Sequence, residues 1–93
     1  MTEPIVEFYW RPGCGFCGRL YRGLDALGIA VVERNIWDDP AAAQRVREVA
    51  RGHETVPTII IGDRALVNPS PQEVADLVEA ARVASQRQDG PGQ

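Results

Sequence analysis

Residues 5–17 have the sequence IVEFYWRPGCGFC, in which a short apolar run leads through a turn to two cysteines. Residues 5–9 are predicted to form a strand, and residues 11–13 contain the proline and glycine that break it. A helix is predicted over residues 15–27, because leucines recur there at helical spacing and Gly28 suits a helix C-terminus. The sequence therefore places both cysteines where a strand gives way to a helix.

The rest of the chain is predicted to contain three more strands and two more helices. The strands are residues 29–36, 57–61 and 64–67, with a Gly62-Asp63 turn between the last two. The helices begin at Pro40, after an Asp39 N-cap, and at Pro71, after a capping box of Ser70 and Glu73. The order β-α-β-α-β-β-α predicts an α/β domain, a four-stranded mixed sheet flanked by three helices.

Length and composition indicate one globular domain. The chain has 93 residues, 44% of them hydrophobic and 25% charged. Residues 1–84 are predicted to form the domain, and the polar residues 85–93 a flexible tail. No apolar run approaches the ~20 residues that span a bilayer. The first residues lack the pattern of a secretory signal. A cytoplasmic monomer with no membrane partner is expected.

The charge pattern argues against nucleic acid as a partner, because duplex binding needs a concentrated positive surface. The net charge is −3, and the only local cluster of basic residues is Arg11, Arg19 and Arg22. We interpret Arg19 and Arg22 as a solvated helix face rather than a docking patch. Trp37, after the second strand, is interpreted as a residue at the edge of the core.

Cys14-Gly15-Phe16-Cys17 is a C-x-x-C motif in a setting typical of redox-active cysteines. A disulfide so short adds little stability, because it closes almost no loop. At a helix start the Cys14 sulfur faces free N–H groups and the positive end of the helix dipole, which lower a thiol pKa. Cys14 is therefore the predicted attacking thiolate, and Cys17 the more buried resolving thiol. A zinc site or a pair of inert core thiols is the alternative. His53 alone cannot complete four ligands, so no metal is expected, and the position between a strand and a helix favours redox chemistry over both.

Thr55-Val56-Pro57 stands at the head of the third predicted strand. An X–Pro bond is a place where a cis peptide can be selected, and the Val56 backbone is then available to another chain. A trans proline that merely begins a strand is the alternative reading.

Cys14-Gly15-Phe16-Cys17, Thr55-Val56-Pro57 and the last helix together resemble a glutaredoxin-type redoxin over residues 4–84. The closer likeness is to the mycoredoxins, glutaredoxin-like proteins of actinobacteria that use mycothiol, and it extends over residues 52–58 and 66–70. The resemblance implies a thioredoxin-like fold, a cis Pro57 and no tightly bound cofactor. It also implies reduction of mycothiol–protein mixed disulfides, with mycothiol as co-substrate. Electrons would come from a separate NADPH-dependent reductase.

One departure from the wider family bears on the thiol. Glutathione-using glutaredoxins usually have a Gly-Gly segment and acidic residues where this chain has Asn68-Pro69-Ser70-Pro71, and a lysine where it has Arg11. A low-molecular-weight thiol other than glutathione is therefore expected. The candidate substrate-binding residues are Arg11, Phe16, Thr55, Val56, Pro57, Asn68 and Ser70.

Several of these residues have a simpler interpretation. Arg11 is equally well explained as a solvated loop residue, and Phe16 as a side chain packed against the helix. Ser70 is first of all a helix cap, so its contact with a thiol is the weaker of its two interpretations.

Two other functions fit the same motifs. One is a glutaredoxin-like electron donor of the ribonucleotide reductase type, reduced by thioredoxin reductase. The other is an iron–sulfur cluster carrier, since glutaredoxins with Cys-Gly-Phe-Ser loops share Gly15 and Phe16. Cys17 in place of that serine favours redox chemistry.

Overall fold

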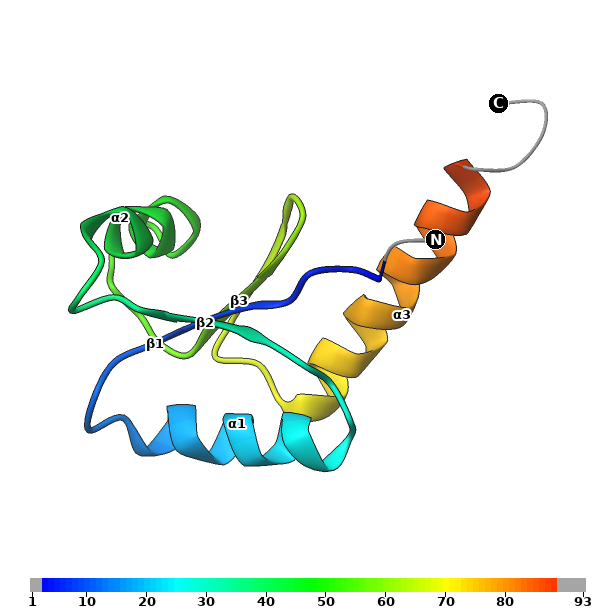
Figure 1. The fold of residues 1–93 in the computed structure, drawn as a ribbon. Helices are drawn as coiled ribbons and strands as arrows, with labels where there is room; N and C mark the ends of the chain where they lie inside the picture. The colour runs from blue at the N-terminus through cyan, green and yellow to red at the C-terminus, as the bar shows by residue number, and fades with distance from the viewer. Residues whose placement is uncertain (1–2, 89–93) are drawn as a thin grey trace.

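The computed structural model describes residues 3–88 and contains seven elements in the predicted order (Figure 1). The strands are β1 (Glu7–Trp10), β2 (Val32–Asn35), β3 (Thr58–Ile61) and β4 (Arg64–Val67). The helices are α1 (Gly15–Ala26), α2 (Pro40–Val49) and α3 (Pro71–Gln88). The sheet order is β2-β1-β3-β4, with β1 parallel to β2 and the other pairs antiparallel. The predicted mixed sheet with three helices is confirmed.

The sheet separates two hydrophobic cores, because successive side chains of a strand point to opposite faces. Phe8 of β1 and Ile59 of β3 belong to the core formed with α1 and α3. Their neighbours Tyr9 and Ile60 belong to the other core, where Val46 of α2 is fully buried. Figure 1 shows α2 on one side of the sheet and α1 on the other. Each such buried side chain contributes roughly 1.5–3 kcal/mol of transfer free energy.

The end of α1 explains one error in the predicted strands. Gly28 has φ +74° and donates its N–H to the Asp25 carbonyl at 3.0 Å. The Ile29 N–H donates to the Leu24 carbonyl at 2.9 Å, which completes a Schellman motif. Ile29 is predicted as the first residue of a strand, but it belongs to this helix cap. Pairing with β1 starts only at Val32.

Other boundaries differ from the prediction by a few residues. The first strand begins at Glu7 instead of residue 5 and continues to Trp10, whose carbonyl accepts from the Ile36 N–H at 2.9 Å. Helix α3 runs to Gln88, so the first four residues of the predicted tail are helical. The rest of that tail, residues 89–93, lies outside the described residues. Within residues 3–88, no helix combines the length and apolarity needed to cross a membrane.

Helices α1 and α3 approach each other closely where Gly23 faces Pro71. A Cβ atom at Gly23 would lie 3.1 Å from the Pro71 Cβ and closer still to its Cγ. A glycine inside a helix costs about 1 kcal/mol relative to alanine. Here it is needed because α3 begins directly against α1, the helix that carries both cysteines.

Candidate active site

Cys14 is the N-cap residue of α1 and is joined by a disulfide to Cys17. The Cys17 backbone N–H donates to the Cys14 Sγ at 3.2 Å. The sulfur therefore lies at the open end of the helix, where unpaired N–H groups and the helix dipole stabilise a negative charge. Cys17 is only 3% exposed and belongs to the core, whereas Cys14 is half-buried. The predicted difference in burial between the two cysteines is confirmed.

The chain reaches Cys14 through a tight turn after β1. Gly13 in this turn has φ +78°, a backbone conformation that favours glycine. Cys14 itself has extended dihedral angles, as an N-cap residue requires, before the helix starts at Gly15. The local sequence Pro12-Gly13-Cys14 thus brings the sulfur to the helix start.

The loop before β3 lies against the Cys14 sulfur. The Cys14 Sγ is 3.9 Å from the Val56 carbonyl oxygen, and the Val56–Pro57 peptide is cis, as the family resemblance implies. Val56 is half-buried and packs against both cores. The Thr58 hydroxyl donates to the Thr55 carbonyl at 2.7 Å, which holds the loop from inside. Of the three residues predicted here, Val56 lies beside the Cys14 sulfur, and Thr55 stabilises the loop through its carbonyl. Pro57 forms the cis peptide with Val56.

The segment before α3 is joined to the same loop. The Asn68 N–H donates to the Pro57 carbonyl at 2.8 Å, and the Asn68 side chain is exposed. The Ser70 N–H donates to Glu73 Oε1 at 2.7 Å, and the Glu73 N–H donates to the Ser70 Oγ at 3.2 Å. Cys14, Val56, Pro57 and Asn68 thus form a continuous line of neighbours. The Ser70 hydroxyl is engaged in the predicted capping box.

Two arginine–aromatic pairs flank the cysteines. Phe16 is 60% exposed, which contradicts the alternative that it packs against the helix, and the Arg19 guanidinium lies 5.2 Å from its ring centre. The Arg11 guanidinium lies 5.7 Å from the ring centre of Trp37. Both distances allow cation–π interactions.

The interpretation of Trp37 as a residue at the core edge is wrong, since its side chain is 62% exposed. Strand β2 ends at Asn35, whose Oδ1 accepts from the Trp37 N–H at 2.9 Å in a turn outside the sheet. The predicted sheet topology already indicated that Trp37 lies near Arg11. Strands β1 and β2 are parallel, so the residues that follow them, Arg11 and Trp37, emerge at one edge of the sheet.

A hollow of about 260 Å³ opens beside the disulfide, between α1 and the edge strand β2. Both cysteines line it, together with Arg11, Arg22 and the ring of Trp10. The Trp10 Nε1 is buried and finds no hydrogen-bond partner among residues 3–88.

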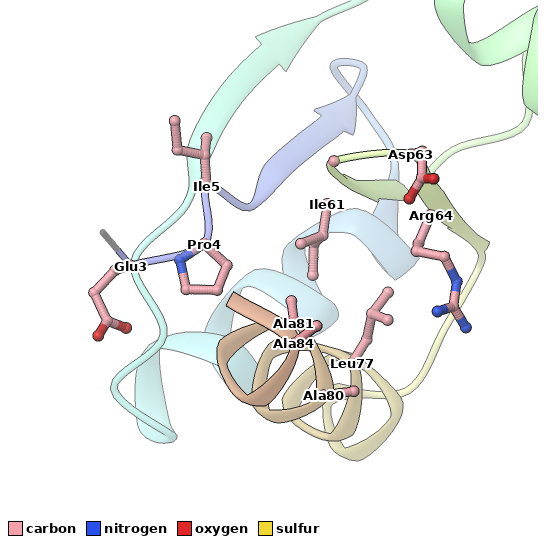
Figure 2. A pocket seen from close by; sticks show the side chains of 11 residues that line it. Glu3, Pro4, Ile5, Ile61, Asp63, Arg64, Leu77, Ala80, Ala81 and Ala84 are labelled. Carbon is pink, nitrogen blue, oxygen red and sulfur yellow. The ribbon is translucent and has the colours of Figure 1, made fainter. Parts of the chain in front are cut away.

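A larger hollow, of about 510 Å³, lies at the opposite end of the sheet. Figure 2 shows it between the residues before β1, the β3–β4 turn and α3, with Ile61, Leu77 and Ala81 facing it. Among the side chains of residues 3–84, no cysteine, serine or threonine lines it.

A half-exposed sulfur at a helix start, with a second sulfur buried behind it, is the arrangement that thiol–disulfide redox proteins require. Residues 6–66 match the glutaredoxin family, and the chain belongs to it. Two proteins from strains of Mycobacterium tuberculosis, each provisionally named a glutaredoxin, are 41% identical to it over 83 residues. The alignment covers 87% of this chain and 99% of the mycobacterial protein.

Solved structures show the same fold. The glutaredoxin-like protein NrdH-redoxin from Escherichia coli is 26% identical and has a TM-score of 0.66, covering 77% of this chain and 92% of that one. A glutaredoxin from Brucella melitensis is 25% identical, with a TM-score of 0.59 over 90% of this chain and 89% of that one. A thioredoxin-like protein at 22% identity has a TM-score of 0.67 over 78% of this chain and 97% of its own. The predicted thioredoxin-like fold is confirmed.

Proposed function

We propose that this glutaredoxin-family oxidoreductase reduces mixed disulfides between proteins and a low-molecular-weight thiol, with mycothiol as that thiol. The observation that carries the proposal is the place of the Cys14 Sγ. Cys14 is half-buried, and its sulfur accepts a hydrogen bond from the Cys17 N–H at 3.2 Å. A thiolate at this position is stabilised and accessible, and the thiolate is the form that attacks disulfides. The likeness to mycobacterial relatives supports mycothiol. The Asn68-Pro69-Ser70-Pro71 segment in place of Gly-Gly argues only against glutathione.

The reaction starts from the reduced pair. The Cys14 thiolate attacks the mycothiol sulfur of the mixed disulfide, and the target protein leaves as a thiolate that takes up a proton. Mycothiol is then bound to Cys14. A second mycothiol displaces it as mycothiol disulfide, or the Cys17 thiolate attacks the Cys14 Sγ and forms the intramolecular disulfide. Either route moves two electrons to the substrate, and a separate NADPH-dependent reductase supplies them.

The Val56 backbone would align the substrate for this attack. Its carbonyl lies 3.9 Å from the Cys14 Sγ. Within the part of the chain that the structure describes, its N–H donates to no backbone acceptor. A substrate backbone running along this loop satisfies both groups and brings its sulfur to Cys14. Arg11 lines the hollow beside the Cys14 sulfur, and Asn68 is hydrogen-bonded to the Pro57 carbonyl. Both are proposed as further contacts, as are Phe16 and the Ser70 hydroxyl, whose oxygen acts only as an acceptor in the capping box.

A second candidate function is that of an electron donor reduced directly by thioredoxin reductase. The similarity to NrdH-redoxin, whose structure is described as explaining a thioredoxin-like activity profile, favours it. The two functions differ in the source of electrons.

A coupled assay of NADPH oxidation separates them. The reduced protein is offered a mycothiol–protein mixed disulfide, with mycothiol and its reductase, glutathione and its reductase, or thioredoxin reductase alone as donor. Fast turnover with mycothiol and its reductase, and slow turnover with the other two donors, supports the first function. Fast turnover with thioredoxin reductase and slow turnover with mycothiol would show that the second is correct.

A further inference from the structure

Three arginines near Cys14 have no carboxylate partner within residues 3–88. They are Arg11, in the loop before Cys14, and Arg19 and Arg22, on α1. Ion pairs of the described residues are formed instead by Arg34, Arg45, Arg47 and Arg82. These three guanidinium groups therefore carry positive charges without ion-pair partners near Cys14, in a chain whose net charge is −3.

Aromatic rings and a backbone carbonyl, rather than acids, contact two of these guanidinium groups. Arg11 lies over Trp37 and donates to the Pro12 carbonyl at 3.1 Å. Arg19 lies over Phe16. Arg22 extends back along α1, where its Nη1 is 3.4 Å from the place of a Cβ at Gly18. Each guanidinium carries five N–H donors, so most of these donors remain available to a partner.

Within residues 3–88, the acids around this surface form no ion pair with its arginines. Asp25, one turn after Arg22 on α1, is among them. Asp39 is the N-cap of α2 and accepts from the Ala41 N–H at 3.1 Å. Asp38 accepts from the Asn35 side chain at 3.2 Å. Among the described residues, Glu33 is the one acid that lines the hollow beside the cysteines, and Arg11 and Arg22 line the same hollow.

We propose that the arginine surface, defined as Arg11, Arg19 and Arg22 with the rings of Phe16 and Trp37, docks an acidic segment of the protein whose disulfide Cys14 reduces. The inference rests on the proposed function, and it replaces the interpretation of Arg19 and Arg22 as a merely solvated helix face. Exposed arginine and large aromatic side chains are the residue types enriched at protein–protein contacts and at their energetic centres. Complementary charge raises the association rate of partners by roughly 10- to 1,000-fold at low salt.

The probes are two synthetic peptides of equal length, each in a mixed disulfide with uncharged 2-mercaptoethanol. One has glutamates on both sides of its cysteine, and the other has lysines. In a single turnover the Cys14 thiolate attacks the peptide disulfide and one thiol leaves with a proton. The Cys17 thiolate then displaces the other thiol from Cys14. Two electrons pass from the dithiol to the peptide disulfide, and the Cys14–Cys17 disulfide forms.

The measured quantity is the ratio of the second-order rate constants for the acidic and the basic peptide. Both rates contain the same reactivity of Cys14. The thiol pKa values of the two peptides differ and add a factor that all variants of the protein share, so docking is measured by the change of the ratio between variants and with salt. At about 20 mM salt we expect a ratio of about ten or more, falling towards one at about 1 M salt as screening increases. Arg19→Gln and Arg22→Gln should each lower the ratio about threefold. Arg64→Gln removes the same charge at the far end of the sheet and should leave the ratio unchanged.

Three results overturn the docking proposal. One is equal rates for the two peptides at low salt. Another is a fall of the ratio in Arg64→Gln as large as in Arg22→Gln. The last is slower reduction of glutathione disulfide in Arg19→Gln and Arg22→Gln with an unchanged peptide ratio, because the surface would then serve a small anionic thiol. Failure of the unmodified protein to reduce either peptide or bis(2-hydroxyethyl) disulfide would instead contradict the proposed function.

Discussion

The two ends of the sheet have hollows of opposite character. Where β1 and β2 finish, the smaller hollow of about 260 Å³ borders both sulfurs and two arginines that have no carboxylate partner within residues 3–88. At the other end the larger hollow of about 510 Å³ is lined mainly by aliphatic side chains, and Glu3 at its margin pairs with Arg82 at 2.8 Å. The volume of a hollow therefore does not indicate where chemistry occurs. A better indicator is a reactive group whose charged form is stabilised by its surroundings.

The sharpest test of this contrast introduces one serine at each end of the sheet. Cys14→Ser should lower the reduction of bis(2-hydroxyethyl) disulfide by more than about 1,000-fold, because a serine hydroxyl is not ionised near neutral pH. Ala80→Ser places the same hydroxyl beside the larger hollow and should leave the rate unchanged. Initial rates with dithiothreitol as reductant measure both. Activity retained in Cys14→Ser would remove this sulfur from the mechanism.

The two ends of α1 should also respond differently to the same substitution. Gly23→Ala should lower the free energy of unfolding by about 1–3 kcal/mol, because the new methyl group overlaps Pro71. Gly18→Ala, near Cys14, meets only the flexible end of Arg22 and should raise it by up to about 1 kcal/mol. Urea unfolding followed by circular dichroism measures both values. Equal effects would show that α3 adjusts its position on α1.

Local patterns in the sequence were sufficient to predict most of the fold. Caps such as Asp39 and Ser70 and the β-branched run before Gly62 fix element types within a few residues. The start of β2 was predicted three residues early, because Ile29 is strand-like by composition. Its role is set by hydrogen bonding to the end of α1, which a propensity argument does not include.

The candidate site likewise contains residues that could be placed from the sequence and others that could not. The places of Cys14 and Cys17 follow from their positions after a strand and at a helix start, which the sequence displays directly. The exposure of Trp37 and its contact with Arg11 depend on two strands being neighbours in space. A tryptophan alone is compatible with core or surface, so tertiary structure was needed to place it.

The two cysteines themselves form a second contrast, between an accessible and a buried sulfur. Cys17→Ser should retain activity within about tenfold of the unmodified protein if a second thiol can release Cys14. With a peptide disulfide and no added thiol, the mixed disulfide on Cys14 should then accumulate, and mass spectrometry detects it. Rapid release of the peptide from Cys17→Ser without added thiol would show that Cys17 is not the resolving group.

The smallest predicted effect concerns the Glu7 carboxylate, which accepts from Tyr9 and pairs with Arg34. It contrasts with the three arginines near Cys14, which have no carboxylate partner within residues 3–88. Burial raises the pKa of Tyr9, and the neighbouring Glu7 carboxylate raises it further. The Tyr9 hydroxyl donates a hydrogen bond to Glu7 Oε1 at 3.2 Å. Above about pH 10 the unfolded phenol loses its proton while the folded one keeps it. The folded state then binds more protons, so this group lowers stability as the pH rises through that range.

Tyr9→Phe has no such proton to retain. Its free energy of unfolding should therefore fall less steeply than that of the unmodified protein between about pH 9 and pH 11, even if the lost hydrogen bond lowers its starting value. Urea unfolding at several pH values gives the two slopes. The exposed Tyr21, changed to phenylalanine in the same way, is the matched control. Parallel curves for Tyr9→Phe and the unmodified protein would mean that the Tyr9 hydroxyl is not held in this environment in solution, and that Glu7 is committed to Arg34 alone.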